Sequence, residues 1–191
     1  MSGDQLLSRR VVITGFMGAG KTTVARVLAA RLGCASIDLD EFIAARHAGR
    51  TPRQIIDEEG EPRFRALETV ALRAALDQRD VRVVIALGGG AWAAEENRQI
   101  IDAHGCLTVW LDAPFELCWR RITAAGDTRP LARDADQARS LFEDRRAGYG
   151  LASLRVSVEE EDAEKIVTRI VEAIIFSGAE RIEEPEGEHD D

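Results

Sequence analysis

One short segment organises this chain: Gly15-Phe16-Met17-Gly18-Ala19-Gly20-Lys21-Thr22. It matches the pattern G-x-x-x-x-G-K-S/T at every position, follows a short apolar run and opens a helical pattern, which is the context in which such a loop binds phosphate. The glycines let the backbone fold so that consecutive amide N–H groups point inward, and the helix N-terminus adds partial positive charge. The segment therefore predicts a site for a nucleoside triphosphate and Mg²⁺.

The same loop supplies candidate side chains for that site. Lys21 can reach the β- and γ-phosphates, and the Thr22 hydroxyl can ligate Mg²⁺. The nucleotide-binding residues expected here are Gly18, Ala19, Gly20, Lys21, Thr22 and Thr23. The motif does not say which acceptor receives the phosphate.

Short apolar runs alternate with helical patterns along the rest of the chain. The expected strands, each nearly continuous in hydrophobicity as in a strand buried on both faces, are Arg10–Thr14, Ala35–Leu39, Arg82–Leu87, Leu107–Leu111 and Leu154–Val158. The helical patterns between and after them are Lys21–Leu32, Glu61–Leu76 and Asp162–Phe176. This alternation predicts an α/β fold with a parallel sheet whose ligands bind at one edge.

Two connections are too long for simple crossovers: residues 40–80 and residues 112–153. Long excursions at one edge of a sheet usually carry substrate sites or lids. The second includes residues 124–130, which are small and polar enough to form a mobile loop. Arg129 in this loop could close over a transferring phosphate.

Composition favours one cytoplasmic domain. The chain has 191 residues, of which 45% are apolar and 31% charged. No apolar run reaches the ~18–20 residues that cross a bilayer, and the start lacks a signal-peptide core. Cys34, Cys106 and Cys118 form no C-x-x-C pair, so neither a disulfide framework nor a zinc site is expected.

The net charge of −9 lies mostly near the C-terminus. Residues 178–191 hold seven acidic residues and one arginine, a composition that cannot order itself by burial. We therefore expect a single domain over residues 1–177 and a disordered acidic tail over residues 178–191, with a partner-binding tail as the alternative. The chain shows no basic pattern for nucleic acid.

Further polar motifs follow the expected strands. Asp38 and Asp40 end the second strand, where alternation places both carboxylates on the side of the phosphate loop. One could hold metal-bound water and the other could receive an acceptor hydroxyl; alternatively, Asp40 only starts the next helix. After the third strand, Gly88-Gly89-Gly90 allows the backbone to approach a ligand closely.

Two arginine motifs lie on expected helices. Arg65 and Glu68 share a helix face, so they form either a plain salt bridge or a pair in which Glu68 orients Arg65 toward an anionic substrate. Arg145, Arg146 and Tyr149 end a later helix, which on its own would be a solvated basic helix end.

Together these motifs resemble the shikimate kinase family, small-molecule kinases of the P-loop, nucleoside-monophosphate-kinase-like type. The resemblance runs from about Arg9 to Phe176. It is carried by the phosphate loop, Asp-Leu-Asp at 38–40, Ala-Gly-Arg-Thr-Pro at 48–52, Gly-Glu-Pro-Arg-Phe-Arg-Ala-Leu-Glu at 60–68, Gly-Gly-Gly-Ala at 88–91, Arg-Pro-Leu at 129–131 and Arg-x-x-x-Tyr at 145–149. The loop alone is generic, whereas the ordered set is much more specific.

The resemblance implies a P-loop three-layer fold: a five-stranded parallel sheet with helices on both faces, a substrate-binding excursion at about 40–80 and a mobile lid at about 123–137. It implies ATP-dependent phosphorylation of the 3-hydroxyl of shikimate to shikimate 3-phosphate, a step of the chorismate pathway to aromatic amino acids. Mg²⁺ would be the cofactor and ATP the co-substrate, with no nucleic acid or membrane partner.

Matching positions then imply individual roles on the substrate side. Arg65 and Arg145 would bind the substrate carboxylate, while Asp40 and the backbone of Gly88, Gly89 and Gly90 would hold the ring hydroxyls. Whether Asp40 is a general base or only orients the hydroxyl stays open.

Roles on the nucleotide side follow in the same way. Thr22 would ligate Mg²⁺ directly and Asp38 through water. Arg129 would contact the phosphates, and Arg121 would lie against adenine. The implied catalytic residues are Lys21, Asp40 and Arg129.

The chain departs from the family pattern at three places. Arg145-Arg146-Ala147-Gly148-Tyr149 stands where Arg-x-Pro-Leu-Tyr is usual, so either arginine could bind the carboxylate, and the spacing from Tyr149 favours Arg145. Residues 159–162 are all acidic where a basic residue often lies near adenine. Trp92 stands where smaller residues are common and could reshape the pocket.

Two alternative functions use the same residues. A P-loop kinase of another small hydroxy acid, such as gluconate, could also use Arg65 and Arg145, although the Asp-x-Asp and Phe-Arg-x-x-Glu motifs point away from gluconate kinases. A nucleotide-binding module without turnover is disfavoured because every catalytic residue type is present. A monomer is expected, because no exposed apolar stripe stands out.

Overall fold

The computed structural model describes residues 10–77, 82–125 and 134–180. Their strands form one parallel five-stranded sheet in the order β2-β3-β1-β4-β5. The strands are β1 (Val11–Thr14), β2 (Ala35–Asp38), β3 (Val83–Ala86), β4 (Leu107–Asp112) and β5 (Leu154–Ser157). The expected α/β fold with a five-stranded parallel sheet is confirmed.

Burial differs between the middle and the edges of this sheet. The central strand β1 is buried at every position and pairs with β3 on one side and β4 on the other, where Ile13 aligns with Ala86 and Val109. The edge strands are not buried on both faces as expected: Ala35 and Ser36 of β2 are exposed, and only Val156 of β5 is buried. An edge strand has a neighbour on one side only, so part of it stays open to water.

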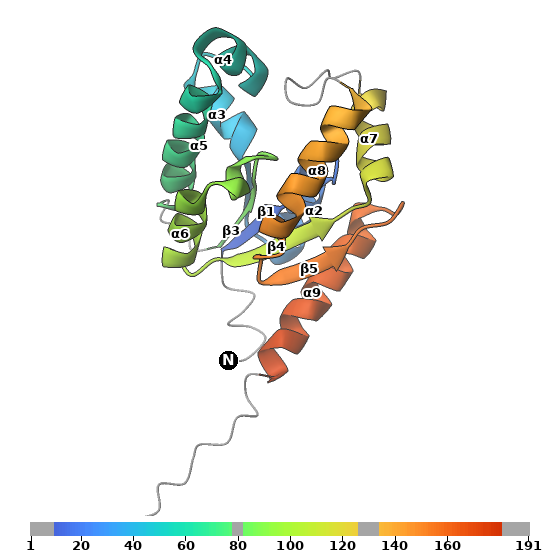
Figure 1. The fold of residues 1–191 in the computed structure, drawn as a ribbon. Helices are drawn as coiled ribbons and strands as arrows, with labels where there is room; N and C mark the ends of the chain where they lie inside the picture. Colours follow the sequence, from blue (N-terminus) through green and yellow to red (C-terminus); the bar gives the residue numbers. More distant parts are fainter. Residues whose placement is uncertain (1–9, 78–81, 126–133, 181–191) are drawn as a thin grey trace, which may run out of the picture.

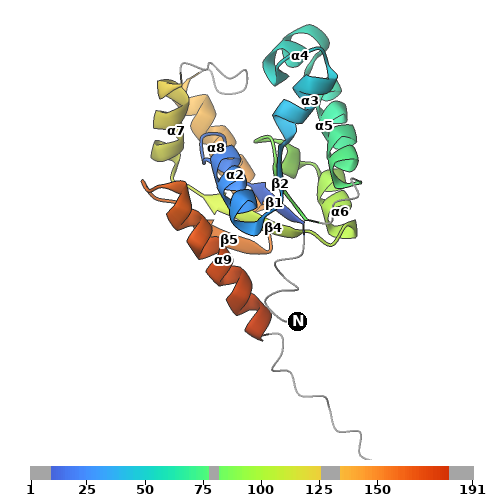
Figure 2. The ribbon, with the colours of Figure 1, turned by 180° about the vertical axis from the view of Figure 1, so that it is seen from behind.

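Helices cover both faces of the sheet. They are α2 (Lys21–Leu32), α3 (Leu39–Arg46), α4 (Pro52–Glu59), α5 (Glu61–Leu76), α6 (Glu95–Ala103), α7 (Phe115–Ala124), α8 (Ala135–Tyr149) and α9 (Ala163–Glu180), with a 3₁₀ turn at Ala91–Ala93. Figure 2 shows α2 and α9 side by side on one face, and Figure 1 shows α8 on the opposite face. The three layers expected from the resemblance are present.

The two long connections build opposite flanks of the molecule. Helices α3, α4 and α5 stand together on one flank, while α7 and α8 pack against each other on the other (Figure 1). The middle of the expected lid, residues 126–133, lies outside the described residues. Helix α9 reaches Glu180, and the remaining expected tail, residues 181–191, also lies outside them.

The core includes the apolar side chains of the phosphate loop itself. Phe16, Met17 and Ala19 are all buried, which anchors the loop to the hydrophobic core on both sides of Gly18. Within the described part of the chain, every helix is too short or too polar to span a bilayer.

The first glycine of the loop generates a stability prediction. Gly15→Ala should lower the free energy of unfolding by about 3 kcal/mol, because strain at positive φ and overpacking add together. Gly15 has φ +141°, and a Cβ there would lie 2.7 Å from the carbonyl oxygen of Leu111. Urea unfolding followed by circular dichroism measures the loss.

Gly33→Ala is the matched control for this prediction. Gly33 ends α2 with φ +64°, but no described heavy atom lies within 4 Å of its would-be Cβ. Only the left-handed strain of about 1 kcal/mol should therefore appear. Equal losses for the two variants would contradict the packing argument.

Candidate active site

The phosphate loop wraps a hollow of about 200 Å³ at the N-terminus of α2. Gly20 caps this helix with φ 95°, and the amino group of Lys21 donates a hydrogen bond to the carbonyl of Phe16 at 2.9 Å. The hollow, called the phosphate pocket below, is lined by Gly18, Gly20, Lys21, Thr22, Thr23, Asp38, Asp40, Leu87, Gly88 and Gly89. The N-terminus of α2, whose first amides have no partner within the helix, makes this pocket suited to anionic phosphates.

Thr22 and Asp38 meet at one side of the phosphate pocket. The Thr22 hydroxyl donates to Oδ2 of Asp38 at 2.5 Å. A hydroxyl and a carboxylate beside phosphate oxygens are the hard oxygen donors that Mg²⁺ prefers, with water completing its shell. The residues present therefore fit a magnesium ion.

The structure corrects how Asp38 and Asp40 are presented. They do not alternate along a strand, because β2 ends at Asp38 and Asp40 lies in the first turn of α3. Oδ1 of Asp38 accepts from the amides of Asp40 at 3.0 Å and Glu41 at 3.2 Å, so Asp38 is the residue that caps the helix. Both aspartates nevertheless line the phosphate pocket.

A second pocket of about 310 Å³ adjoins the first. This substrate-side pocket is lined by Met17, Asp40, Thr51, Pro52, Arg53, Ile56, Phe64, Arg65, Glu68, Gly88, Gly89, Gly90 and Arg145. Asp40, Gly88 and Gly89 line both pockets, so the two spaces meet at these residues. An acceptor group held at Asp40 would therefore face the phosphate pocket.

Arg65 reaches the substrate-side pocket from α5 with its guanidinium already paired. It donates to Glu61 at 2.8 and 3.1 Å and to Oε2 of Glu68. The salt bridge anticipated from the sequence is therefore present, and it also directs the guanidinium into the pocket wall. Gly90 allows this approach, because a Cβ there would lie 2.6 Å from an Arg65 nitrogen.

Glu68 is a pocket residue that the expected site did not include. Its side chain is 1% exposed, and its Oε1 accepts no hydrogen bond from the described residues. The pKa of Glu68 is raised to about 7: burial is the largest cause, the charge of Asp40 also raises it, and Arg65 and Arg145 lower it. The spacing to Arg65 was the available signal, but spacing alone does not reveal burial.

The structure separates the two neighbouring arginines of α8. Arg145 lines the substrate-side pocket and donates to the carbonyl of Gly89 at 2.9 Å. Arg146 points away and binds both carboxylate oxygens of Asp112, at 2.8 and 3.0 Å, where Arg155 also binds. The placement agrees with the spacing from Tyr149.

The other arginines and Trp92 have different positions. Arg121 donates to the carbonyl of Gly18 at 3.2 Å and so touches the phosphate loop. Arg129 lies outside the described residues. Trp92 is buried and is not among the described residues that line the substrate-side pocket.

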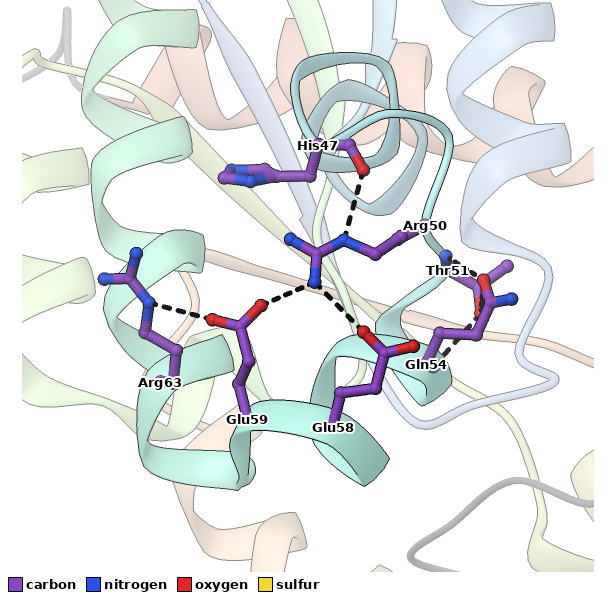
Figure 3. Close-up of polar contacts among 7 residues, drawn as sticks. All are labelled: His47, Arg50, Thr51, Gln54, Glu58, Glu59 and Arg63. Carbon is purple, nitrogen blue, oxygen red and sulfur yellow. Dashed lines mark hydrogen bonds and ion pairs between the residues drawn. The ribbon is translucent and has the colours of Figure 1, made fainter.

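Helix α4 forms the outer wall of the substrate-side pocket through Thr51, Pro52, Arg53 and Ile56. A capping box starts it: the Thr51 hydroxyl accepts from the amide of Gln54 at 3.3 Å, and the Gln54 side chain accepts from the amide of Thr51 at 2.8 Å (Figure 3). These wall residues had no assigned role, although residues 48–52 belong to the motif set.

Arg50 holds the two ends of α4 together (Figure 3). One of its nitrogens donates to Glu58 at 3.1 Å and to Glu59 at 2.6 Å. Its hydrogen bond lowers the pKa of Glu59, which also accepts from Arg63 at the start of α5. This network fixes the wall against the helix that carries Arg65.

The fold and the paired pockets define a class of protein: a P-loop kinase that acts on a small molecule. The sequence profile of the shikimate kinase family matches residues 17–175. This chain belongs to the shikimate kinase family.

Individual relatives agree with that assignment. Shikimate kinase from Nostoc punctiforme is 42% identical over 166 residues, covering 85% of this chain and 88% of the relative. Shikimate kinase from Salinibacter ruber is 39% identical over 176 residues, with coverages of 86% and 84%.

Solved structures agree as well. Shikimate kinase from Acinetobacter baumannii in complex with shikimate superposes with a TM-score of 0.82 at 30% identity, covering 92% of this chain and 98% of that one. A gluconokinase from Sinorhizobium meliloti has a TM-score of 0.64 at 19% identity, covering 92% and 96%, and shows the fold alone.

The raised pKa of Glu68 predicts a pH-dependent stability. The pKa of the native carboxyl is about 7, whereas the ordinary pKa of a glutamate is 4.5. Between these values the native state binds more protons than the unfolded state, so the contribution of Glu68 to stability falls as pH rises. Glu68→Gln removes this titration.

The difference in free energy of unfolding, wild type minus Glu68→Gln, should therefore fall by on the order of 3 kcal/mol across that window. Urea unfolding of both proteins at several pH values measures it. Because both proteins share every other titrating group, a difference that stayed constant with pH would contradict the assignment.

Proposed function

We propose that this chain uses ATP to phosphorylate the 3-hydroxyl of shikimate, giving shikimate 3-phosphate in the chorismate pathway to aromatic amino acids. The observation that carries the proposal is the junction of two pockets at Asp40, Gly88 and Gly89, with Arg65 and Arg145 lining one pocket and the phosphate loop lining the other. Membership of the shikimate kinase family supports it.

The substrate carboxylate binds Arg65 and Arg145 in this proposal. The two side chains come from α5 and α8, and both line the substrate-side pocket. Charge-assisted hydrogen bonds from guanidinium forks suit a planar carboxylate. Asp40 and the backbone of Gly88–Gly90 then hold the ring hydroxyls.

The phosphates of ATP occupy the phosphate pocket. Amides of the loop from Gly18 to Thr23 and the amino group of Lys21 surround them, and Arg121 touches the loop from α7. We propose that Thr22 ligates Mg²⁺ directly and Asp38 through water. The ion would neutralise charge on the β- and γ-phosphates. Arg129 is proposed to contact the phosphates from the lid.

The chemistry is in-line transfer of the γ-phosphoryl group to the hydroxyl. Because the transition state is loose, the protein contributes chiefly positioning and charge stabilisation. Asp40 lies where the two pockets meet, so its carboxylate can accept the hydrogen bond of the attacking hydroxyl and aim it at the phosphate. Lys21 stabilises the developing charge on the phosphate oxygens.

We also propose a monomer working in the cytoplasm. Cys106 and Cys118 are free thiols, a state that a reducing compartment favours.

Lys21→Met tests the nucleotide side. Methionine fills a similar volume at this 9% exposed position but lacks the charge, so turnover should fall by about two orders of magnitude or more while the fold persists. Coupled measurement of ADP release with shikimate, together with the melting temperature, separates the two effects. Near-normal kcat in a folded variant would contradict the assignment of Lys21.

Alanine variants of Arg65, Arg145 and Arg146 test the substrate side. Arg65→Ala and Arg145→Ala should each lower kcat/KM for shikimate, by a factor that corresponds to roughly 2–4 kcal/mol of lost binding free energy. ATP binding in the absence of shikimate should be little changed. Arg146→Ala should act mainly on stability, because it leaves the buried Asp112 with fewer partners.

Lysine should rescue Arg65 or Arg145 poorly, because a point charge cannot reproduce a planar fork. Steady-state kinetics with both substrates varied measure all of these variants. Normal kcat/KM in both Arg65→Ala and Arg145→Ala would overturn the carboxylate clamp, and gluconate-dependent turnover in its place would favour the alternative kinase.

A further inference from the structure

Three hydrogen bonds tie the last turn of α8 to the segment that follows β3. The guanidinium of Arg145 and the hydroxyl of Tyr149 both donate to the carbonyl of Gly89, at 2.9 and 2.8 Å. In the reverse direction, the indole N–H of Trp92 donates to the carbonyl of Gly148 at 2.8 Å. The helix and the glycine segment therefore hold each other from both sides.

The turn that carries Trp92, the donor of the third hydrogen bond, is itself held in place. Trp92 is 3% exposed and lies in the 3₁₀ turn directly after Gly90. The carbonyl of Ala91 accepts from the buried Asn97 at 2.8 Å, and the carbonyl of Trp92 accepts from Arg98 at 2.8 Å. Both partners belong to α6, so the backbone of the turn that carries the indole is held by that helix.

The acceptor lies at a weak point of the helix. Gly148 sits one residue before the end of α8, where glycine costs a helix about 1 kcal/mol relative to alanine through backbone entropy. No described atom lies within 4 Å of a Cβ built at Gly148, so packing does not require glycine there. The Gly148 carbonyl accepts from the amide of Leu151 at 3.1 Å, and the indole of Trp92 adds a second bond from outside the helix. This bond reaches the helix end, where the last carbonyls lack partners within the helix and the turn frays most easily.

We propose that Trp92 is a positioning residue for the substrate side of the site. Its indole N–H holds the Gly148 carbonyl and so fixes the last turn of α8, which keeps the Arg145 guanidinium at the pocket. Trp92 itself lies outside the substrate-side pocket and acts through Gly148. The inference rests on the proposed function, because shikimate binding is its readout.

Trp92→Phe tests it by keeping an aromatic ring and removing the donor. The KM for shikimate should rise about three- to tenfold, the factor that one neutral hydrogen bond is worth, with kcat and the KM for ATP nearly unchanged. Trp119→Phe is the matched control, because Trp119 stacks on Phe115 in α7, away from this turn. It should leave the KM for shikimate unchanged.

Gly148→Ala supplies a rescue that a purely structural loss would not show. Alanine favours the helical backbone more than glycine does, and its methyl group would meet no described atom within 4 Å. In the Trp92→Phe background it should therefore recover most of the lost shikimate affinity. Hydrogen exchange at residues 145–151 should quicken in Trp92→Phe and slow again in the double variant.

The outcomes separate the inference from the proposed function. An unchanged KM for shikimate in folded Trp92→Phe, or an equal rise in both KM values, overturns the role of Trp92 while wild-type turnover of shikimate stands. A double variant that regains thermal stability without regaining shikimate affinity also overturns it. Wild type that does not phosphorylate shikimate at all removes the proposed function and the inference with it.

Discussion

The missing side chain at Gly88 is the constraint on which the site depends. A Cβ at this position would lie 2.6 Å from Oδ1 of Asp40 and 2.8 Å from Oε1 of Glu68. Two carboxylates from α3 and α5 therefore converge on one glycine at the end of β3. Any larger residue would force these carboxylates to move at the point where the two pockets meet. Gly90 plays the same part for the guanidinium of Arg65.

Such convergence brings charges out of water, and the arrangement of partners limits the cost. Glu68 is nearly inaccessible, so its ionised form depends on Arg65 beside it and on Arg145 farther off. Pairing with Glu68 and Glu61 also sets the direction of the Arg65 fork before any substrate arrives. The guanidinium is therefore already ordered before a carboxylate ligand binds. This preorganisation lowers the entropy cost of binding and favours affinity.

Sequence was most informative where one physical rule acts locally. The phosphate loop, the parallel sheet and the separation of Arg145 from Arg146 followed from motif context, strand alternation and spacing from Tyr149. Prediction from the sequence failed where a residue's position or burial depends on neighbours that are distant along the chain. No local pattern marks β2 and β5 as sheet edges, or shows that Asp38 and not Asp40 caps α3. The burial of Glu68 depends on helices far apart in sequence, and so does its raised pKa.

The hydrogen bond between Trp92 and Gly148 is another contact that the sequence alone does not reveal. Along the chain, Trp92 after the glycine run and Gly148 beside Tyr149 are two separate departures from the family pattern. In space they are the donor and acceptor of one hydrogen bond. The indole adds a bond from outside the helix to a carbonyl that also accepts from the amide of Leu151, and it comes from the segment whose backbone lines the pocket. Two changes that look independent in sequence are therefore coupled through the geometry of a single pocket wall.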